Sequence, residues 1–184
     1  MGLLVITVGP MFSGKTDWLV DRFDEASAQG IELIAVRPAI DSRTPVGQIR
    51  SHSGRTIPAA SVASDSDFAG IPLGTLVVAD EIQFLSQPMI AALIRHASEG
   101  AGVVAAGLDY DFARRPFEVT TALIEAADEV VVRTATCTRC GGGAGFTQRF
   151  ANGVPAPLDA DRIVVGDETT YRPRCESCWL EERP

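Results

Sequence analysis

The sequence lacks any apolar run long enough to cross a membrane. A spanning helix needs about 20 predominantly apolar residues, and charged residues, glycine or proline interrupt every apolar stretch before that length. The first ten residues, MGLLVITVGP, also lack the basic segment and the cleavage signature of a signal peptide. We therefore expect a soluble, cytoplasmic protein with no membrane partner.

Basic side chains and histidine are also scarce. The 184 residues include 16 Lys and Arg against 24 Asp and Glu, which gives a net charge of -8, and two histidines. An acidic chain without a basic patch is a poor binder of nucleic acid, so no nucleic-acid partner is expected, although a local site can still hold a small anion. Nothing in the sequence resembles a Ser/His/Asp or Cys/His nucleophile arrangement. We expect His96 to be structural and leave the role of His52 open.

The order of the apolar segments predicts the fold class. Apolar, β-rich runs at residues 3–8, 31–38, 75–81, 101–107 and 127–133 are joined to helical patterns at residues 16–29 and 87–100. A strand, a loop, a helix and a second strand in succession form a βαβ unit, which implies a parallel sheet. The length allows one full core and a small appended module. The sequence therefore predicts an α/β protein.

Two segments depart from this alternation. Residues 38–74 are rich in Ser, Asp, Gly and Pro, and we expect a long, partly mobile excursion there. After Arg133 the composition changes, because two cysteine pairs flank a segment with little helical period. We therefore predict a boundary near Thr134, with a nucleotide-binding domain at residues 1–134 and a small metal-binding domain at residues 135–184.

A phosphate-binding loop follows the first predicted strand. Its residues fit the spacing G-x-x-x-x-G-K-[ST], and they are Gly9, Pro10, Met11, Phe12, Ser13, Gly14, Lys15 and Thr16. The two glycines allow backbone conformations that let successive N–H groups converge on phosphate oxygens at a helix amino terminus. Lys15 adds a cation, and Thr16 adds a hydroxyl for magnesium. The motif predicts a phosphate-loop NTPase-like domain that binds ATP with Mg²⁺.

Two adjacent carboxylates end a later predicted strand. Asp80 resembles the acidic residue that supports magnesium in phosphate-loop proteins, and Glu81 follows it directly. Because consecutive strand side chains diverge, we expect two separate roles. One carboxylate orients the metal, and the other accepts a proton from an attacking hydroxyl.

The four cysteines form two C-x-x-C pairs, Cys137 with Cys140 and Cys175 with Cys178. Each pair can bind one side of a tetrahedral zinc ion. Two disulfides are the alternative, which a cytosolic location disfavours. Four thiolates leave no open position for water, so the predicted Zn²⁺ is structural rather than catalytic.

Several aromatic residues stand in or beside these loops, namely Phe12, Phe84, Phe112 and Tyr171. An aromatic base could stack on them, although each taken alone is as easily a core residue. Phe117 stands outside these loops.

Taken together, these features resemble the thymidine kinase family of the cytosolic, zinc-containing type. The resemblance covers nearly the whole chain and is carried by GPMFSGKT, DSR at residues 41–43, DEIQF at residues 80–84, GLDYDFARRPF at residues 107–117 and VVGDETTYRPRCESC at residues 164–178. It implies transfer of the γ-phosphoryl group of ATP to the 5'-hydroxyl of thymidine or deoxyuridine, in pyrimidine deoxynucleotide salvage. It also implies a homotetramer and feedback inhibition by thymidine triphosphate (dTTP).

The resemblance assigns a role to each matching residue. Glu81 matches the catalytic base, while the phosphate loop, Asp80 and Gln83 match the ATP–magnesium site. The segment between the cysteine pairs matches a lasso loop that closes over the base and is pinned at both ends by zinc. The matches to the nucleoside site are Met11, Phe84, Leu108, Phe112 as the stacking aromatic, Thr147 near the base methyl, Arg149 as support for the lasso, Val164, Gly166 and Tyr171.

Three residues depart from the family pattern. Ile82 stands where a small residue is common, Asp17 replaces the usual polar residue after the loop, and Asp167 follows Gly166 where many members have a second glycine. The resemblance places Asp167 close to the lasso contacts, so base selectivity is the property that we expect this departure to affect. Two other functions stay open: a kinase for another nucleoside, and a non-catalytic nucleotide-dependent switch with a zinc unit.

Overall fold

A six-stranded parallel sheet forms the centre of the molecule. The structure is a computed structural model that describes residues 2–41, 47–164, 166 and 169–182. The strand order is β5-β2-β6-β7-β1-β8, and every pairing in this sheet is parallel. The strands are β1 Leu4–Val8, β2 Leu33–Pro38, β5 Ala60–Val62, β6 Leu76–Ala79, β7 Val103–Gly107 and β8 Glu129–Val132. The predicted α/β class with a parallel sheet is confirmed.

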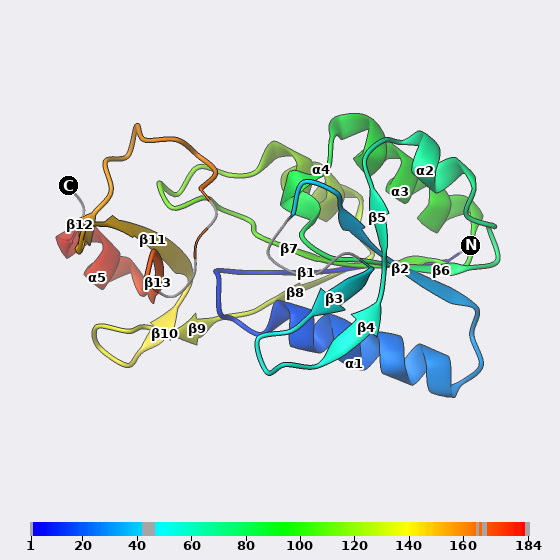
Figure 1. The fold of residues 1–184 in the computed structure, drawn as a ribbon, viewed down its shortest axis with the longest axis horizontal. Helices are drawn as coiled ribbons and strands as arrows, with labels where there is room; N and C mark the ends of the chain where they lie inside the picture. The colour runs from blue at the N-terminus through cyan, green and yellow to red at the C-terminus, as the bar shows by residue number, and fades with distance from the viewer. Residues whose placement is uncertain (1, 42–46, 165, 167–168, 183–184) are drawn as a thin grey trace.

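Helices cover both faces of this sheet (Figure 1). Helix α1, Lys15–Ala28, lies on one face, and α3, Gln87–Glu99, and α4, Glu118–Ala126, lie on the other. Leu19 and Val20 of α1 pack against one face, whereas Leu93 of α3 and Leu123 of α4 pack against the opposite face. The sheet is therefore buried on both sides, which explains why its strands read as continuous apolar runs.

Two expectations about this region need correction, and one helix was not expected. Residues 47–69, expected to be part of a mobile excursion, form regular elements: the hairpin of β3, Gln48–Arg50, with β4, Thr56–Pro58, then β5 and the short helix α2, Ser66–Ala69. Helix α4 was not predicted from the sequence. Strand β6 ends at Ala79, so Asp80 and Glu81 follow the strand and are not part of it. Glu81 has a left-handed backbone conformation.

The hairpin is held against α1 by ion pairs. Arg55 beside β4 lies 2.6 Å from Asp21 and 2.7 Å from Asp24 of α1. Ser53 at the hairpin tip donates a hydrogen bond to Asp17. Asp17, which departs from the family pattern, thus forms a hydrogen bond with the hairpin. These contacts are long-range in sequence, which is why composition alone suggested mobility.

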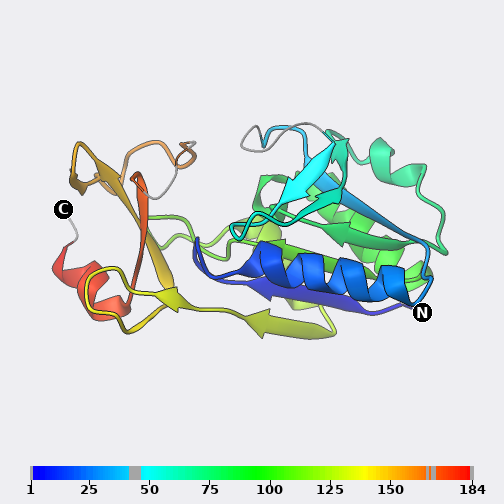
Figure 2. The same cartoon turned by 60° about the horizontal axis from the view of Figure 1, so that its bottom comes forward.

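The cysteine-bearing segment, of which the structure describes residues 135–164, 166 and 169–182, lies at one end of the molecule, beyond the carboxyl ends of β1 and β8 (Figure 2). The elements of this cysteine unit are β9 Ala135–Thr136, β10 Gly143–Ala144, β11 Phe146–Ala151, β12 Val154–Pro155, β13 Tyr171–Arg174 and α5 Glu176–Glu181. Strand β11 pairs with both β12 and β13 in antiparallel register. The domain boundary near Thr134 stays a prediction. Within the described residues, no helix is long and apolar enough to span a membrane.

Candidate active site

The phosphate loop joins β1 to α1 and has an unusual backbone. Gly9 has φ 144°, and a Cβ there would lie 2.2 Å from the carbonyl oxygen of Arg133. Gly14 has φ 75°, and Phe12 has φ 64° although it is not glycine. Positive φ angles at these positions allow successive backbone N–H groups to converge on a ligand near the amino terminus of α1. The loop therefore has the shape that an anion site requires.

Two side chains of the loop form hydrogen bonds, one within the loop and one to a residue outside it. Lys15 Nζ lies 2.6 Å from the carbonyl oxygen of Pro10 and 3.3 Å from Ser13 Oγ. Thr16 Oγ1 donates to Asp80 Oδ2 at 3.1 Å. The hydroxyl and the carboxylate predicted to serve magnesium are thus in direct contact.

Asp80 is buried, and burial raises its pKa to about 7, with the charge of Glu81 acting in the same direction. Hydrogen bonds from the Glu81 amide and from Thr16 oppose this rise. A carboxylate and a hydroxyl oxygen side by side are ligands that Mg²⁺ prefers, and a bound cation would favour the ionised carboxylate that burial disfavours. The residues present therefore fit a magnesium site.

Glu81 is the first residue of a sharp turn. It has φ 52° and precedes the short 3-10 helix η1, Ile82–Phe84. Gln83 Nε2 donates to Glu81 Oε2, and Gln83 Oε1 accepts from the backbone N–H of Leu108 at 3.0 Å. A left-handed glutamate costs backbone strain of about 1 kcal/mol or more, and such strain clusters at functional sites. Gln83 thus orients the carboxylate from a position fixed by β7.

Two adjoining cavities meet at the carboxyl edge of the sheet. The first, of about 240 Å³, is lined by the phosphate loop from Met11 to Asp17, by Asp80 and Glu81, and by the hairpin residues Ile49 to His52. The second, of about 260 Å³, is mainly apolar and is lined by residues of η1, the loop after β7 and the cysteine unit. Both include Met11, Asp41 and Leu108 in their walls. The two cavities therefore adjoin, and we call the first the polar arm and the second the apolar arm of the candidate site.

The structure brings most of the predicted residues into these two arms. The polar arm contains Met11, Phe12, Ser13, Gly14, Lys15, Thr16, Asp80 and Glu81, and the apolar arm contains Met11, Gln83, Phe84, Leu108, Phe112, Thr147, Val164, Gly166 and Tyr171. Gln83, expected beside ATP, instead lines the apolar arm. Gly9, Pro10 and Arg149 are not among the lining residues of either arm. Arg149 places its guanidinium 3.9 Å from the centre of the Phe112 ring and donates to the Asp161 carbonyl, so it supports the lasso segment.

The lasso segment is attached to the rest of the apolar arm by specific contacts. Tyr171 Oη donates to the carbonyl oxygen of Val164 at 2.7 Å. Arg162 lies 3.0 Å from Asp111 and covers the ring of Phe117 at 4.4 Å. Asp167, the departure expected to affect base selectivity, lies outside the described residues, as do Ser42 and Arg43 of the DSR motif.

Several residues of the site were missed by sequence reasoning. Phe117, set aside as remote from the loops, lines the apolar arm. Arg50 and His52 line the polar arm because the hairpin folds over it, and His52 meets the ring of Phe12 edge-on at 5.7 Å between centroids. Asp109, after β7, lines neither arm; burial raises its pKa, and backbone hydrogen bonds and the charge of Lys15 oppose this rise.

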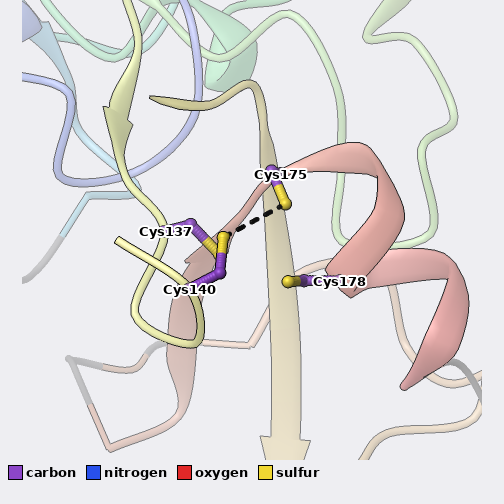
Figure 3. Close-up of side chains that lie close together, drawn as sticks. All are labelled: Cys137, Cys140, Cys175 and Cys178. Carbon is purple, nitrogen blue, oxygen red and sulfur yellow. Dashed lines mark hydrogen bonds between the residues drawn. The ribbon is translucent and has the colours of Figure 1, made fainter. Parts of the chain in front are cut away.

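The four cysteines converge in the cysteine unit (Figure 3). All four are free, and their Sγ atoms lie within 4.8 Å of one another. The Sγ atoms of Cys140 and Cys175 are 3.6 Å apart, and thiolates around a tetrahedral zinc ion are about 3.8 Å apart. Although burial acts against it, backbone N–H groups lower the pKa of Cys137. The cluster fits a four-thiolate metal site, since all four thiols can reach one ion.

A phosphate loop after β1, a buried acid after β6 and two adjoining cavities, one polar and one apolar, define a nucleotide-binding protein of the phosphate-loop class. A family model described as "Thymidine kinase" matches residues 2–179. The chain belongs to the thymidine kinase family.

Individual thymidine kinases are similar in sequence to this chain over nearly its full length. A thymidine kinase of Pyrobaculum aerophilum is 38% identical over 97% of this chain and 98% of its own. A thymidine kinase of Roseiflexus sp. (strain RS-1) is also 38% identical, over 97% of this chain and 95% of its own. Among solved structures, the genome packaging NTPase B204 from Sulfolobus turreted icosahedral virus 2 matches at 15% identity and a TM-score of 0.45, over 71% of this chain and 74% of its own. That likeness is too low to inform function.

Proposed function

We propose that the protein is a thymidine kinase, which transfers the γ-phosphoryl group of ATP to the 5'-hydroxyl of thymidine or deoxyuridine and releases ADP. The observation that carries this proposal is the place of Glu81. It lines the polar arm, while its hydrogen-bond partner Gln83 lines the apolar arm. A carboxylate at this junction can reach both a terminal phosphate and a hydroxyl that enters from the other side.

The polar arm would hold the triphosphate. Backbone N–H groups of the loop and Lys15 would bind its oxygens, while Thr16 and Asp80 would hold Mg²⁺. The cation supplies charge neutralisation between the phosphates when bound. In-line phosphoryl transfer depends mainly on positioning and charge neutralisation, so fixed groups of this kind account for much of the expected catalysis.

Glu81 would act as the general base. Its carboxylate would take the proton of the 5'-hydroxyl as that oxygen attacks the γ-phosphorus atom, and the leaving group would be ADP. The Gln83 amide would keep the carboxylate facing the junction throughout the step. General-base contributions are typically about 10² to 10⁴-fold.

The apolar arm would hold the nucleobase. Phe112 would stack on the pyrimidine ring, and Thr147 would lie near the base methyl. Val164 and Gly166 would read the base through backbone groups, with Tyr171 fixing the segment through its bond to the Val164 carbonyl. The resident metal of the four cysteines would be structural Zn²⁺, which would hold both ends of this segment in place.

We also propose assembly into a homotetramer, inhibition by dTTP and a cytoplasmic location. Assembly has support in strand β8, which is an edge of the sheet and leaves Val132 69% exposed and Val130 38% exposed. An exposed edge strand with apolar side chains favours pairing with a second copy of the chain. Size-exclusion chromatography with light scattering measures the molar mass of the wild type and of Val132→Asp. A lower molar mass for the variant than for the wild type supports assembly through β8, and equal molar masses contradict it.

The activity is tested with labelled γ-phosphate of ATP, magnesium and a panel of nucleosides. The wild type should label thymidine, Glu81→Gln should lose about 10² to 10⁴-fold in turnover, and Glu125→Gln on the exposed side of α4 should behave as wild type. Near-normal turnover of Glu81→Gln would contradict the assigned base. Binding of ATP without phosphorylation of any nucleoside would favour the nucleotide-switch function, and labelling of another nucleoside alone would identify a different kinase.

A further inference from the structure

Arg133 follows β8 and lies beside the start of the phosphate loop. Its backbone N–H donates to the carbonyl oxygen of Val8 at 2.8 Å, at the end of β1. Its own carbonyl oxygen occupies the space that a Cβ at Gly9 would need, at 2.2 Å. The backbone of Arg133 is therefore fixed against the first residues of the loop.

The side chain of Arg133 runs along the back of the loop. Nε donates to the carbonyl oxygen of Ser13 at 2.9 Å. Nη2 lies 3.4 Å from the position that a Cβ at Gly14 would take. Ser13 and Gly14 line the polar arm, and Arg133 is not among its lining residues. The guanidinium therefore contacts the Ser13 carbonyl without forming part of the cavity wall.

The contact between Arg133 and the Ser13 carbonyl also determines the direction of the Gly14 N–H. In a trans peptide the carbonyl of one residue and the N–H of the next point in opposite directions, and none of the described peptide bonds is cis. When Arg133 holds the Ser13 carbonyl at the back of the loop, the N–H of Gly14 must face the front. The front is the polar arm, where the phosphates of a nucleotide would lie.

The alternative orientation of this peptide would be harmful. Glycine accepts a wide range of backbone angles, so the Ser13–Gly14 peptide can rotate more easily than its neighbours. After rotation, the Ser13 carbonyl oxygen would face the phosphate oxygens, and two acceptors would oppose each other. The charged donor of Arg133 favours the productive orientation, since hydrogen bonds to charged groups are stronger than neutral ones.

We propose that Arg133 is a positioning residue of the phosphate loop: it holds the Ser13–Gly14 peptide with its N–H toward the nucleotide phosphates and thereby sets ATP affinity. This inference rests on the ATP site of the proposed function. It concerns a residue in the connection between β8 and the cysteine unit, outside the phosphate-loop motif itself.

Two substitutions of Arg133 separate its donor from its bulk. Arg133→Leu keeps an apolar stem and removes the donor, while Arg133→Lys keeps a positive charge and one donor group. Arg95→Ala, an exposed arginine on α3, is the control. The measurements are the Kd of ATP with magnesium, the Kd of thymidine, the KM for ATP, kcat and the melting temperature.

Arg133→Leu should weaken ATP binding and raise the KM for ATP by roughly tenfold, the effect of losing one charge-assisted hydrogen bond. Its kcat at saturating ATP and its Kd for thymidine should stay close to wild type. Arg133→Lys should recover part of the lost affinity, and Arg95→Ala should match wild type. In ¹⁵N-labelled protein, addition of ADP should shift the Gly14 amide proton less in Arg133→Leu than in wild type.

Two results would overturn the inference. One is wild-type ATP affinity in Arg133→Leu. The other is an equal loss of ATP and thymidine binding together with a lower melting temperature, which would show a general structural role. Because ATP affinity is measured by binding, the inference is decided separately from the proposed function. A wild type that binds ATP but phosphorylates no nucleoside would refute only the proposed function.

Discussion

The sheet region, residues 2–133, and the cysteine unit are held together in different ways. The sheet region buries large aliphatic side chains on both faces, and Ile6, Ile90 and Leu93 are at most 1% exposed. Around the four cysteines, the buried cluster consists of Cys137, Ala144 and Cys178. Small units with little apolar burial usually depend on a metal or on disulfides. The comparison suggests different sources of stability: we expect the sheet region to depend on its aliphatic core, and the segment around the four cysteines to depend on a bound metal.

The two regions also contribute differently to the site. The sheet region supplies the polar arm, whereas Thr147, Val164 and Tyr171 of the cysteine unit complete the apolar arm. Loss of the cysteine unit should therefore remove nucleoside binding and leave phosphate binding largely intact. The predictions below test this division from the largest expected effect to the smallest.

Removal of the metal should have the largest effect. Structural zinc contributes an apparent binding free energy of about 10 to 16 kcal/mol in zinc-finger peptides. A chelator, or Cys178→Ser, should abolish amide protection across β11 and β13 and abolish thymidine binding, while β1 and α1 stay protected and ATP still binds. Hydrogen exchange by mass spectrometry and metal analysis measure this, and readdition of zinc to the chelated wild type is the control. Persistent protection of β11 in metal-free protein would contradict the comparison.

Truncation of the core should affect the sheet region alone. Leu93→Ala removes a fully buried side chain from between α3 and the sheet, and comparable changes cost about 2 to 5 kcal/mol. Urea unfolding should show this loss whether or not metal is bound. Leu73→Ala, at a position 50% exposed, is the matched control and should change little. A loss that disappears on metal removal would show that the two regions do not have separate sources of stability.

The sequence predicted the parts of the fold and site that local pattern determines. Strand β1, the phosphate loop and α1 are contiguous, and their apolar periodicity and glycine spacing are local signals. The cysteine pairs were also identifiable, because C-x-x-C spacing by itself fits one side of a metal site. These elements depend little on what the remaining chain does.

The parts that were missed depend on contacts between distant residues. The hairpin of β3 and β4 was taken for mobile chain because its partners, Asp21 and Asp24, lie on a different element. The turn after β7 brings Phe117 to the apolar arm. The turn of η1 places Gln83 in the apolar arm and against Glu81, and not beside the nucleotide as the sequence suggested. Composition and spacing carry no signal for such placements, which are set by the tertiary fold.

A single hydrogen bond between the two regions should have a smaller effect. Thr147 Oγ1 in β11 accepts from the backbone N–H of Met11 in the phosphate loop at 2.9 Å. Thr147→Val keeps the shape and removes the acceptor, which should cost about 1 kcal/mol. Urea unfolding of metal-loaded protein measures the loss, with the exposed Thr136→Val as control. Thymidine binding should weaken as well, and unchanged stability would show that the bond does not join the two regions.

The attachment of the hairpin should have the smallest effect and should depend on pH. Although burial acts against it, hydrogen bonds from Ser53 and Ser51 and the charge of Arg55 lower the pKa of Asp17 below 3.8. A carboxyl whose folded-state pKa is lowered stabilises the protein above its unfolded pKa, and the contribution is lost as pH falls through the folded value. Because the groups are largely exposed, we expect a few tenths of a kcal/mol. Amide exchange of residues 48–58, corrected for intrinsic rates, should rise below about pH 4 in the wild type. In Asp17→Asn it should already be higher at neutral pH and should respond less to acid. The same acid response in both proteins would show that the hairpin is held by its other contacts. The contact with Asp17 would then not be required to keep the hairpin over the polar arm.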